Sequence, residues 1–193
     1  MRRGVLGGTF DPIHLGHLRA AENAREALGL DQVLFIPSGS PPHRGAPLSS
    51  ALDRFAMVAL ATAGQPSFVA SDVELARDGP SYTADTMAAL RREGPADQLF
   101  LIVGSDTFPE MATWRDPERL FASCTVAVAE RPGAAAPELA AARGSGLRVE
   151  RVSGPGLAVS ATEVRRRVRE GLSVRYLVPD GVADYIAKRG LYR

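Results

Sequence analysis

The chain has 193 residues, 45% of them hydrophobic, and its 23 basic residues nearly balance its 22 acidic ones. This length and composition predict one domain with a core of its own, spanning residues 1–193, while a net charge of +1 argues against a general nucleic-acid surface or an anionic-membrane binder. The single cysteine excludes an internal disulfide. With no apolar run near the ~20 residues of a membrane helix and no leader before the first strand, we expect a cytoplasmic protein.

The N-terminal stretch has the pattern of a strand, a glycine turn and the start of a helix. Val5 and Leu6 precede the paired glycines, Gly7 and Gly8, and a helical pattern begins near Leu15 and runs to residue 28. Open α/β sheets bind phosphates at such turns. The glycines let the backbone approach a ligand closely, and the free N–H groups at the helix start favour an anion.

This turn matches neither of the common phosphate-binding loops. A Walker loop needs Lys-Ser/Thr after its last glycine, and a dinucleotide fingerprint needs a third glycine; the chain has neither here. It has instead His14 and His17, which share one face of the first helical turn. Gly16 between them lowers helix stability, which indicates that another group lies close to that backbone. The alternative is that one histidine caps the helix and the other packs.

A strand over 32–36 follows and completes a β-α-β unit with a right-handed crossover. The next loop carries His43 and Arg44 at the same sheet edge as the first motif, so both are expected near the anion site unless they belong to a solvated loop. Ser50 is expected to cap a helix over 51–63, on which Arg54 points either toward the active edge or to the surface.

A second helix start follows a strand predicted over 68–73. Ser81 or Thr83 is expected to cap a helix over 84–92, and the free N–H groups at its start can hold a carboxylate. The alternative is a capped helix that binds no ligand.

The strongest buried strand is predicted over 99–103, which is apolar at every position as central parallel strands are. Asp106 follows it and either accepts hydrogen bonds from a ribose or caps the next short helix. Trp114 has polar flanks, so it is either a stacking platform or part of the core. Strands are expected over 124–129 and 147–152, with a surface helix over 137–143 between them.

A second anion site is predicted near residue 160. Ser160 and Glu163 have the spacing of a capping box, so a helix should start at Ser160. Thr162 and Arg165 then lie on one face beside free N–H groups, which suits a phosphate; a capped helix with a solvated arginine face is the alternative. A closing helix over 182–189, capped by Asp180, completes a small C-terminal helical part from about residue 160.

Together these elements predict an α/β fold: a single Rossmann-like, doubly wound domain with a mainly parallel central sheet. The run from Gly7 to His17 resembles the signature of the H-x-G-H nucleotidyltransferase superfamily. More narrowly, the chain resembles the bacterial nicotinate-mononucleotide adenylyltransferase family. Two positions depart from the pattern, since Arg44 stands where the family has lysine and Ala161 where the superfamily has a second serine.

The resemblance implies adenylyl transfer from ATP to nicotinate mononucleotide, giving deamido-NAD and pyrophosphate in NAD biosynthesis. A phosphate nucleophile is already an anion, so catalysis reduces to positioning and charge stabilisation, which imidazoles and arginines can supply. The implied site residues are His14, His17 and Arg165 in catalysis; Gly8, Thr9, Phe10, Gly16, Arg44, Gly104, Asp106, Ser160 and Thr162 on ATP; and Tyr82, Thr83 and Trp114 on the nicotinate nucleotide.

Mg²⁺ is expected on the triphosphate itself, without a dedicated protein metal site. ATP and nicotinate mononucleotide are the expected partners, neither nucleic acid nor a membrane is expected, and assembly into a homo-oligomer stays open. One alternative is a sister adenylyltransferase acting on nicotinamide mononucleotide or pantetheine phosphate. The other is a non-catalytic nucleotide-binding regulator.

Overall fold

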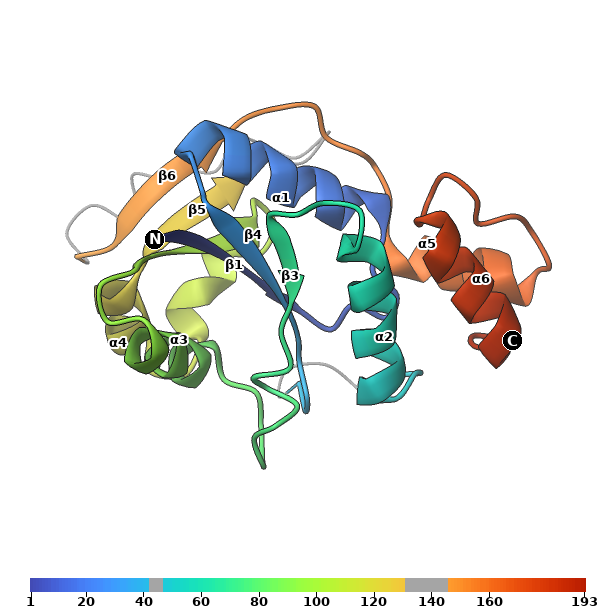
Figure 1. Cartoon of the computed structure of the whole chain (residues 1–193), viewed down its shortest axis with the longest axis horizontal. Helices are drawn as coiled ribbons and strands as arrows, with labels where there is room; N and C mark the ends of the chain where they lie inside the picture. The colour runs from blue at the N-terminus through green and yellow to red at the C-terminus, as the bar shows by residue number, and fades with distance from the viewer. Residues whose placement is uncertain (42–46, 131–145) are drawn as a thin grey trace.

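The computed structural model describes residues 1–41, 47–130 and 146–193. Its centre is a six-stranded sheet in the order β3-β2-β1-β4-β5-β6, in which each neighbouring pair is parallel (Figure 1). The strands are β1 Arg2–Gly8, β2 Gln32–Pro37, β3 Phe68–Ala70, β4 Gln98–Gly104, β5 Thr125–Ala129 and β6 Arg148–Val152.

The strand order confirms the predicted Rossmann-like fold. From β1 the chain winds outward through β2 to β3, then returns to place β4 on the other side of β1. The order therefore reverses between β1 and β4, and open α/β sheets bind ligands beyond the carboxyl ends of the strands at such a point. Gly7 and Gly8, predicted to form a turn, are instead the last residues of β1 and pair with β2, so the turn at this switch point begins at Thr9.

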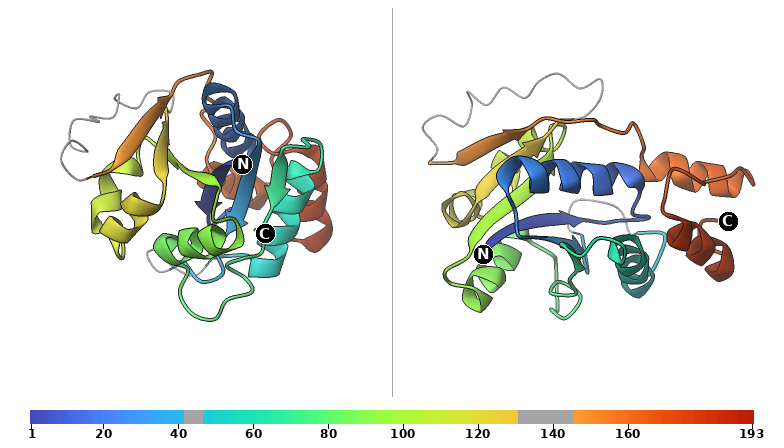
Figure 2. Two further views of the ribbon diagram at one scale, coloured as in Figure 1. Left: turned by 60° about the vertical axis from the view of Figure 1, so that its left-hand side comes forward. Right: turned by 45° about the horizontal axis from the view of Figure 1, so that its top comes forward.

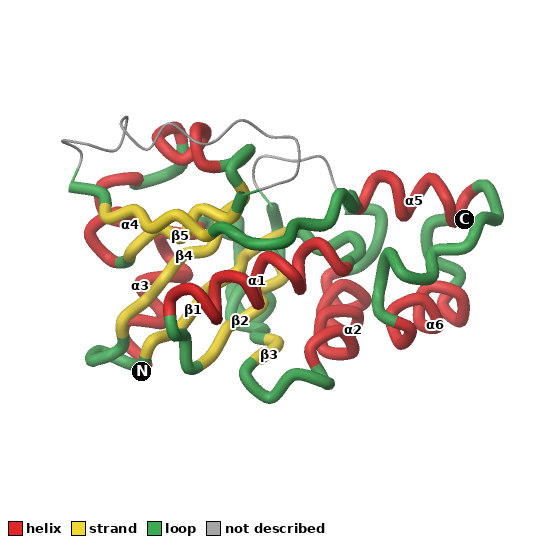
Figure 3. Tube along the Cα trace, turned by 90° about the horizontal axis from the view of Figure 1, so that it is seen from above, coloured by secondary structure: helices red, strands yellow, loops and turns green. Residues whose placement is uncertain are grey.

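Helices cover both faces of the sheet: Figure 2 shows α1 along one face and α3 against the other. Figure 3 shows the last two helices, α5 and α6, beyond the edge at which β1 ends. The bounds are α1 Leu15–Leu28, α2 Ala51–Thr62, α3 Thr83–Glu93, α4 Pro117–Ser123, α5 Ala161–Arg169 and α6 Asp180–Arg189, with a 3₁₀ helix, η1, over Phe108–Thr113.

Two hydrophobic cores follow from the alternation of side chains along each strand. Leu6 belongs to a buried cluster with residues of α1, α2, α5 and α6. Its neighbour Val5 belongs to a second cluster with residues of α3, η1 and α4. Each fully buried Leu, Ile or Phe side chain stabilises the fold by about 1.5–3 kcal/mol. Since β1 contributes side chains to both cores, packing on both faces of the sheet fixes the position of the turn that follows it.

Several helix ends agree with the sequence. Gly29 ends α1 in the left-handed conformation, with φ of +56°, as a C-terminal glycine usually does. Ser50 caps α2 by accepting a hydrogen bond from the Asp53 amide. Ser160 accepts from the Glu163 amide at 3.1 Å, but the Glu163 carboxylate binds Arg166 instead of completing the capping box.

Other ends differ from the prediction. The N-cap of α3 is Tyr82, because the Ser81 hydroxyl accepts hydrogen bonds from the amides of Gly39 and Ser40 instead. The N-cap of α6 is Pro179, whose carbonyl already accepts the first helical hydrogen bonds, so Asp180 lies inside the helix.

One predicted strand is shorter in the structure, and two predicted features lie outside the described residues. Strand β3 ends at Ala70, before the predicted 73, because the chain turns where the amide of Leu75 donates to the carbonyl of Asp72. The loop residues His43 and Arg44 and the helix predicted over 137–143 lie outside the residues that the structure describes.

Candidate functional site

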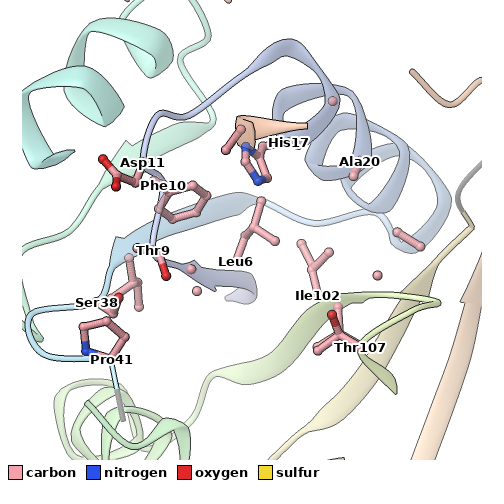
Figure 4. Close-up of a pocket in the computed structure, with 18 of the residues that line it drawn as sticks. Leu6, Thr9, Phe10, Asp11, His17, Ala20, Ser38, Pro41, Ile102 and Thr107 are labelled. Carbon is pink, nitrogen blue, oxygen red and sulfur yellow. The ribbon is translucent and has the colours of Figure 1, made fainter. Parts of the chain in front are cut away.

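A cavity of about 660 Å³ opens at the carboxyl ends of β1 and β4, where the strand order places a ligand (Figure 4). Of the site residues predicted from the sequence, Arg44 lies outside the described residues. The others line this one cavity: Gly8, Thr9, Phe10, His14, Gly16, His17, Tyr82, Thr83, Gly104, Asp106, Trp114, Ser160, Thr162 and Arg165.

The two histidines of the turn form a stacked pair. Their ring centroids lie 3.6 Å apart with the planes 19° from parallel, so the spacing does place both on one face. The backbone amide of His14 donates to Nδ1 of His17 at 3.2 Å. With Nδ1 as the acceptor, a neutral His17 carries its proton on Nε2. The edge of Phe10, 5.1 Å away between centroids, supports the His17 ring.

Gly16 confirms the close approach expected at its position. A Cβ there would lie 3.0 Å from Nδ1 of His14 and 3.3 Å from the carbonyl oxygen of Leu157. Leu157 belongs to the segment that leads into α5. Any side chain at Gly16 would therefore displace the His14 ring or the backbone at Leu157.

Arg165 joins the start of α5 to the histidine turn. Its Nη1 donates to the carbonyl oxygen of Asp11 at 2.7 Å, and its Nη2 donates to the Thr162 hydroxyl at 3.2 Å. Two helix openings, those of α1 and α5, thus face the same cavity with imidazole and guanidinium groups. Helix N-termini and cations together favour bound phosphates.

The start of α3 forms another part of the cavity wall. Tyr82 and Thr83 line it, and the guanidinium carbon of Arg115 lies 4.7 Å from the Tyr82 ring centroid. Trp114 lines the cavity and also packs, partly buried, against the core on the α3 side; its role as a stacking platform stays a prediction. The N-cap of η1 is Thr107, which excludes the capping alternative for Asp106.

Arg54, which the sequence left undecided, is buried beneath the turn, with only 1% of its surface exposed. Its Nη1 donates to the Thr9 carbonyl at 2.8 Å, and its Nη2 reaches the Gly39 carbonyl at 3.4 Å. Burial lowers the pKa of this guanidinium, while the charge of Asp11 opposes the shift. The buried cation therefore ties the loop after β1 to the loop after β2.

Two further residues were missed from the sequence. The buried Asp11 carboxylate accepts a hydrogen bond from the hydroxyl of Tyr192 at 2.7 Å. Asp11 stands inside the conspicuous motif and offered a signal of its own, as a carboxylate within an otherwise cation-rich turn. Tyr192 offered none, because no local pattern indicates a contact across 181 residues.

Residues 1–41, 47–130 and 146–193 contain no group of three or more His, Cys, Asp or Glu side chains that could hold a metal ion. Among the helices described, none is both long and apolar enough to cross a membrane.

Sequence comparison places the chain among known proteins. The model of the cytidylyltransferase-like family matches residues 5–167. A protein of Thermus thermophilus is 47% identical over 193 residues, covering 100% of both chains. A protein of Geobacter metallireducens is 45% identical over 214 residues, covering 100% of this chain and 98% of its own. Both bear the name "Probable nicotinate-nucleotide adenylyltransferase".

Solved structures share the fold. The Plasmodium falciparum nicotinic acid mononucleotide adenylyltransferase complexed with NaAD superposes with a TM-score of 0.82 at 16% identity, covering 99% of this chain and 97% of that one. The same Plasmodium enzyme complexed with APC gives a TM-score of 0.81 at 17% identity, covering 99% and 96%. At these identities the likeness concerns the fold alone.

Proposed function

The chain belongs to the cytidylyltransferase-like family, among its nicotinate-nucleotide adenylyltransferases, and from this premise we propose that it transfers the adenylyl group of ATP to nicotinate mononucleotide. The products are deamido-NAD and pyrophosphate. One observation carries the proposal: the openings of α1 and α5 bring His14, His17 and Arg165 to a single cavity at the switch point of the sheet.

The reaction suits this set of side chains. The 5′-phosphate of nicotinate mononucleotide attacks the α-phosphorus of ATP, and the bond to the pyrophosphate oxygen breaks. The nucleophile is already an anion, so no general base is required. His14 and His17 stabilise the charge that builds on the phosphates in the transition state, and Arg165 with Thr162 holds the departing pyrophosphate.

The other ATP contacts are proposed from the residues that line the cavity and, for Arg44, from the sequence alone. The backbone from Gly8 through Thr9 to Phe10 lines the phosphates, and Gly16 leaves room for the stacked histidines beside them. The remaining ATP-binding residues are Ser160 at the start of α5, Gly104 and Asp106 after β4, and Arg44, which keeps its predicted role as a phosphate contact.

The start of α3 is proposed to select the nicotinate end. Backbone N–H groups near Tyr82 and Thr83 suit a carboxylate, because a helix N-terminus favours negative charge. An amide in the same place would present its own NH₂ group to those donors. Trp114 would then stack on the pyridine ring.

Magnesium is proposed to be held mainly by the ATP phosphates. Mg²⁺ commonly binds through substrate phosphates with few protein ligands, and the cavity lined by His14, His17 and Arg165 at two helix starts suits such a triphosphate. Bound there, the ion neutralises charge on the triphosphate. The single domain over residues 1–193 and the cytoplasmic location stay predictions, as does any homo-oligomer.

A paired substrate assay tests the proposal. Pyrophosphate release is measured with ATP, magnesium and, in turn, nicotinate mononucleotide, nicotinamide mononucleotide and pantetheine phosphate. We expect kcat/KM for the acid to exceed that for the amide by roughly tenfold or more, the effect of one charge-assisted hydrogen bond. Equal or faster turnover of another acceptor points to a sister enzyme, and no turnover of any acceptor to a nucleotide-binding regulator.

A further inference from the structure

The Asp11 carboxylate links its own turn to two segments that are distant in sequence, residues 48–49 and the segment that contains Tyr192. It is 7% exposed and accepts from the Leu48 amide at 2.8 Å, from the Ser49 hydroxyl, and from the Tyr192 hydroxyl at 2.7 Å. Figure 4 shows the carboxylate turned away from His17, so it does not face the reacting groups directly.

The backbone of Asp11 belongs to the catalytic turn itself. Its carbonyl accepts the Nη1 donation from Arg165, and the preceding residue, Phe10, has a φ of +49°. A non-glycine residue in this left-handed region is held there by its surroundings and not by its own preference. The shape of the turn therefore depends on what anchors Asp11.

The segment after α5 anchors the turn on the side away from the cavity. Tyr192 is 8% exposed, and it belongs to the same buried cluster as Phe10 and Ile13. A second tie lies just beyond His14, where the Leu15 amide donates to the carbonyl of Leu177 at 2.9 Å. The C-terminal segment thus grips the turn before and after its first histidine.

We propose that Tyr192 is a positioning residue for the adenylyl transfer. Its hydroxyl fixes Asp11, and Asp11 in turn fixes the distance between the stacked histidines and Arg165. Loss of this hydroxyl leaves the carboxylate short of one buried donor and frees the turn to shift. The inference relies on the proposed function for its kinetic readout alone, because the placement of the histidine rings can be measured without turnover.

The chain offers a matched control in Tyr185. Its hydroxyl donates to Oδ1 of Asp53 at 2.8 Å, linking α6 to α2, so it is another tyrosine-to-aspartate bond in the same C-terminal segment without contact to Asp11. Tyr192→Phe and Tyr185→Phe each remove one hydroxyl and keep the ring. We expect Tyr192→Phe to lower kcat roughly tenfold, since sub-ångström displacement suffices for such losses, with KM for ATP within about twofold; Tyr185→Phe should leave both within about twofold.

Ring signals of histidine give the second readout. The chain has 3 histidines, so ¹³C-histidine NMR spectra are simple to assign, and the signals of His14 and His17 should move in Tyr192→Phe but stay in place in Tyr185→Phe. The proposal stands only if both kcat and the ring signals change in the first variant and neither changes in the second; any other combination overturns it. If Tyr192→Phe does not fold, the same criterion applies to Ser49→Ala, which removes another donor to Asp11. An inactive wild type would contradict the proposed function, and the ring signals alone would then decide the role of Tyr192.

Discussion

Replacing Gly16 by alanine should separate activity from stability. The new Cβ would lie 3.0 and 3.1 Å from atoms of the His14 ring and 3.3 Å from the Leu157 carbonyl, against 3.4–4 Å for ordinary contacts. The His14 ring is only 3% exposed and stacks on His17. The stacked pair or the Leu157 backbone must therefore shift by a few tenths of an ångström.

The sizes of the two effects differ. Alanine gains at most about 1 kcal/mol of helix propensity over glycine, while overpacking of a tight site costs about 1–3 kcal/mol. The two nearly offset, so we expect the free energy of unfolding to change by less than about 2 kcal/mol. Misplaced catalytic groups cost up to roughly 100-fold in rate per ångström. We therefore expect kcat for pyrophosphate release to fall roughly ten- to a hundredfold.

Gly181→Ala is the matched control. Gly181 is the second residue of α6, as Gly16 is of α1. A Cβ at Gly181 would meet only Leu60, at an ordinary 3.7 Å. We expect this variant to keep wild-type kcat and to melt at the same or a higher temperature. If Gly16→Ala turns over within about twofold of Gly181→Ala, the argument that the glycine makes room for His14 is wrong.

Three other outcomes are expected. His17→Asn should lower kcat at least roughly 100-fold, because it removes a donor to the transferring phosphates, and should shift the melting temperature little, since the side chain faces the cavity; a kcat near wild type would contradict its role. Arg54→Met should destabilise the fold by about 1–3 kcal/mol in denaturant melts by leaving the partly buried Thr9 and Gly39 carbonyls without its donors, and an unchanged midpoint would show that other groups replace it. Burial raises the pKa of the Cys124 thiol from 9.0 to about 11. The unfolded chain therefore releases this proton at lower pH than the folded chain, and the thiol's contribution to stability should be lost as pH rises from about 9 through 11. Cys124→Ala should abolish that part of the pH dependence of the free energy of unfolding.

Most of the elements were readable from local patterns, whereas the assignment of the cavity residues also used the family resemblance and α4 was not predicted. Strands such as β4 are continuous apolar runs, and the starts of α2 and α5 carry Ser50 and Ser160, whose hydroxyls cap them as expected. The β-α-β connections then determine the strand order, and that order brings the ends of distant motifs to one edge. This explains why Arg165 could be expected beside the histidine turn, although its partner there, Asp11, lies 154 positions earlier in the chain.

The features that the sequence did not indicate depend on contacts between distant segments, which leave no periodic pattern in the sequence. Arg54 lies three and four residues before the fully buried Met57 and Val58, on the inner face of α2, but its charge left its position undecided. Its burial depends on the carbonyls of Thr9 and Gly39, which two distant loops supply. The N-cap of α3 shifted to Tyr82 because Ser81 found donors in the loop after β2. In each case a polar side chain makes a hydrogen bond to a segment that comes close only after the sheet has assembled, and local propensity does not encode such a bond.

The bond between Asp11 and Tyr192 also has a consequence for biosynthesis. The histidine turn is translated before its carboxylate anchor, which is made by a residue 181 positions later. A ribosome-bound chain can assemble the sheet before it can complete this anchor, and contacts of such long separation form slowly during folding. Catalytic competence should therefore arrive only after Tyr192 has been synthesised, even where the strands that carry the histidine turn have paired earlier.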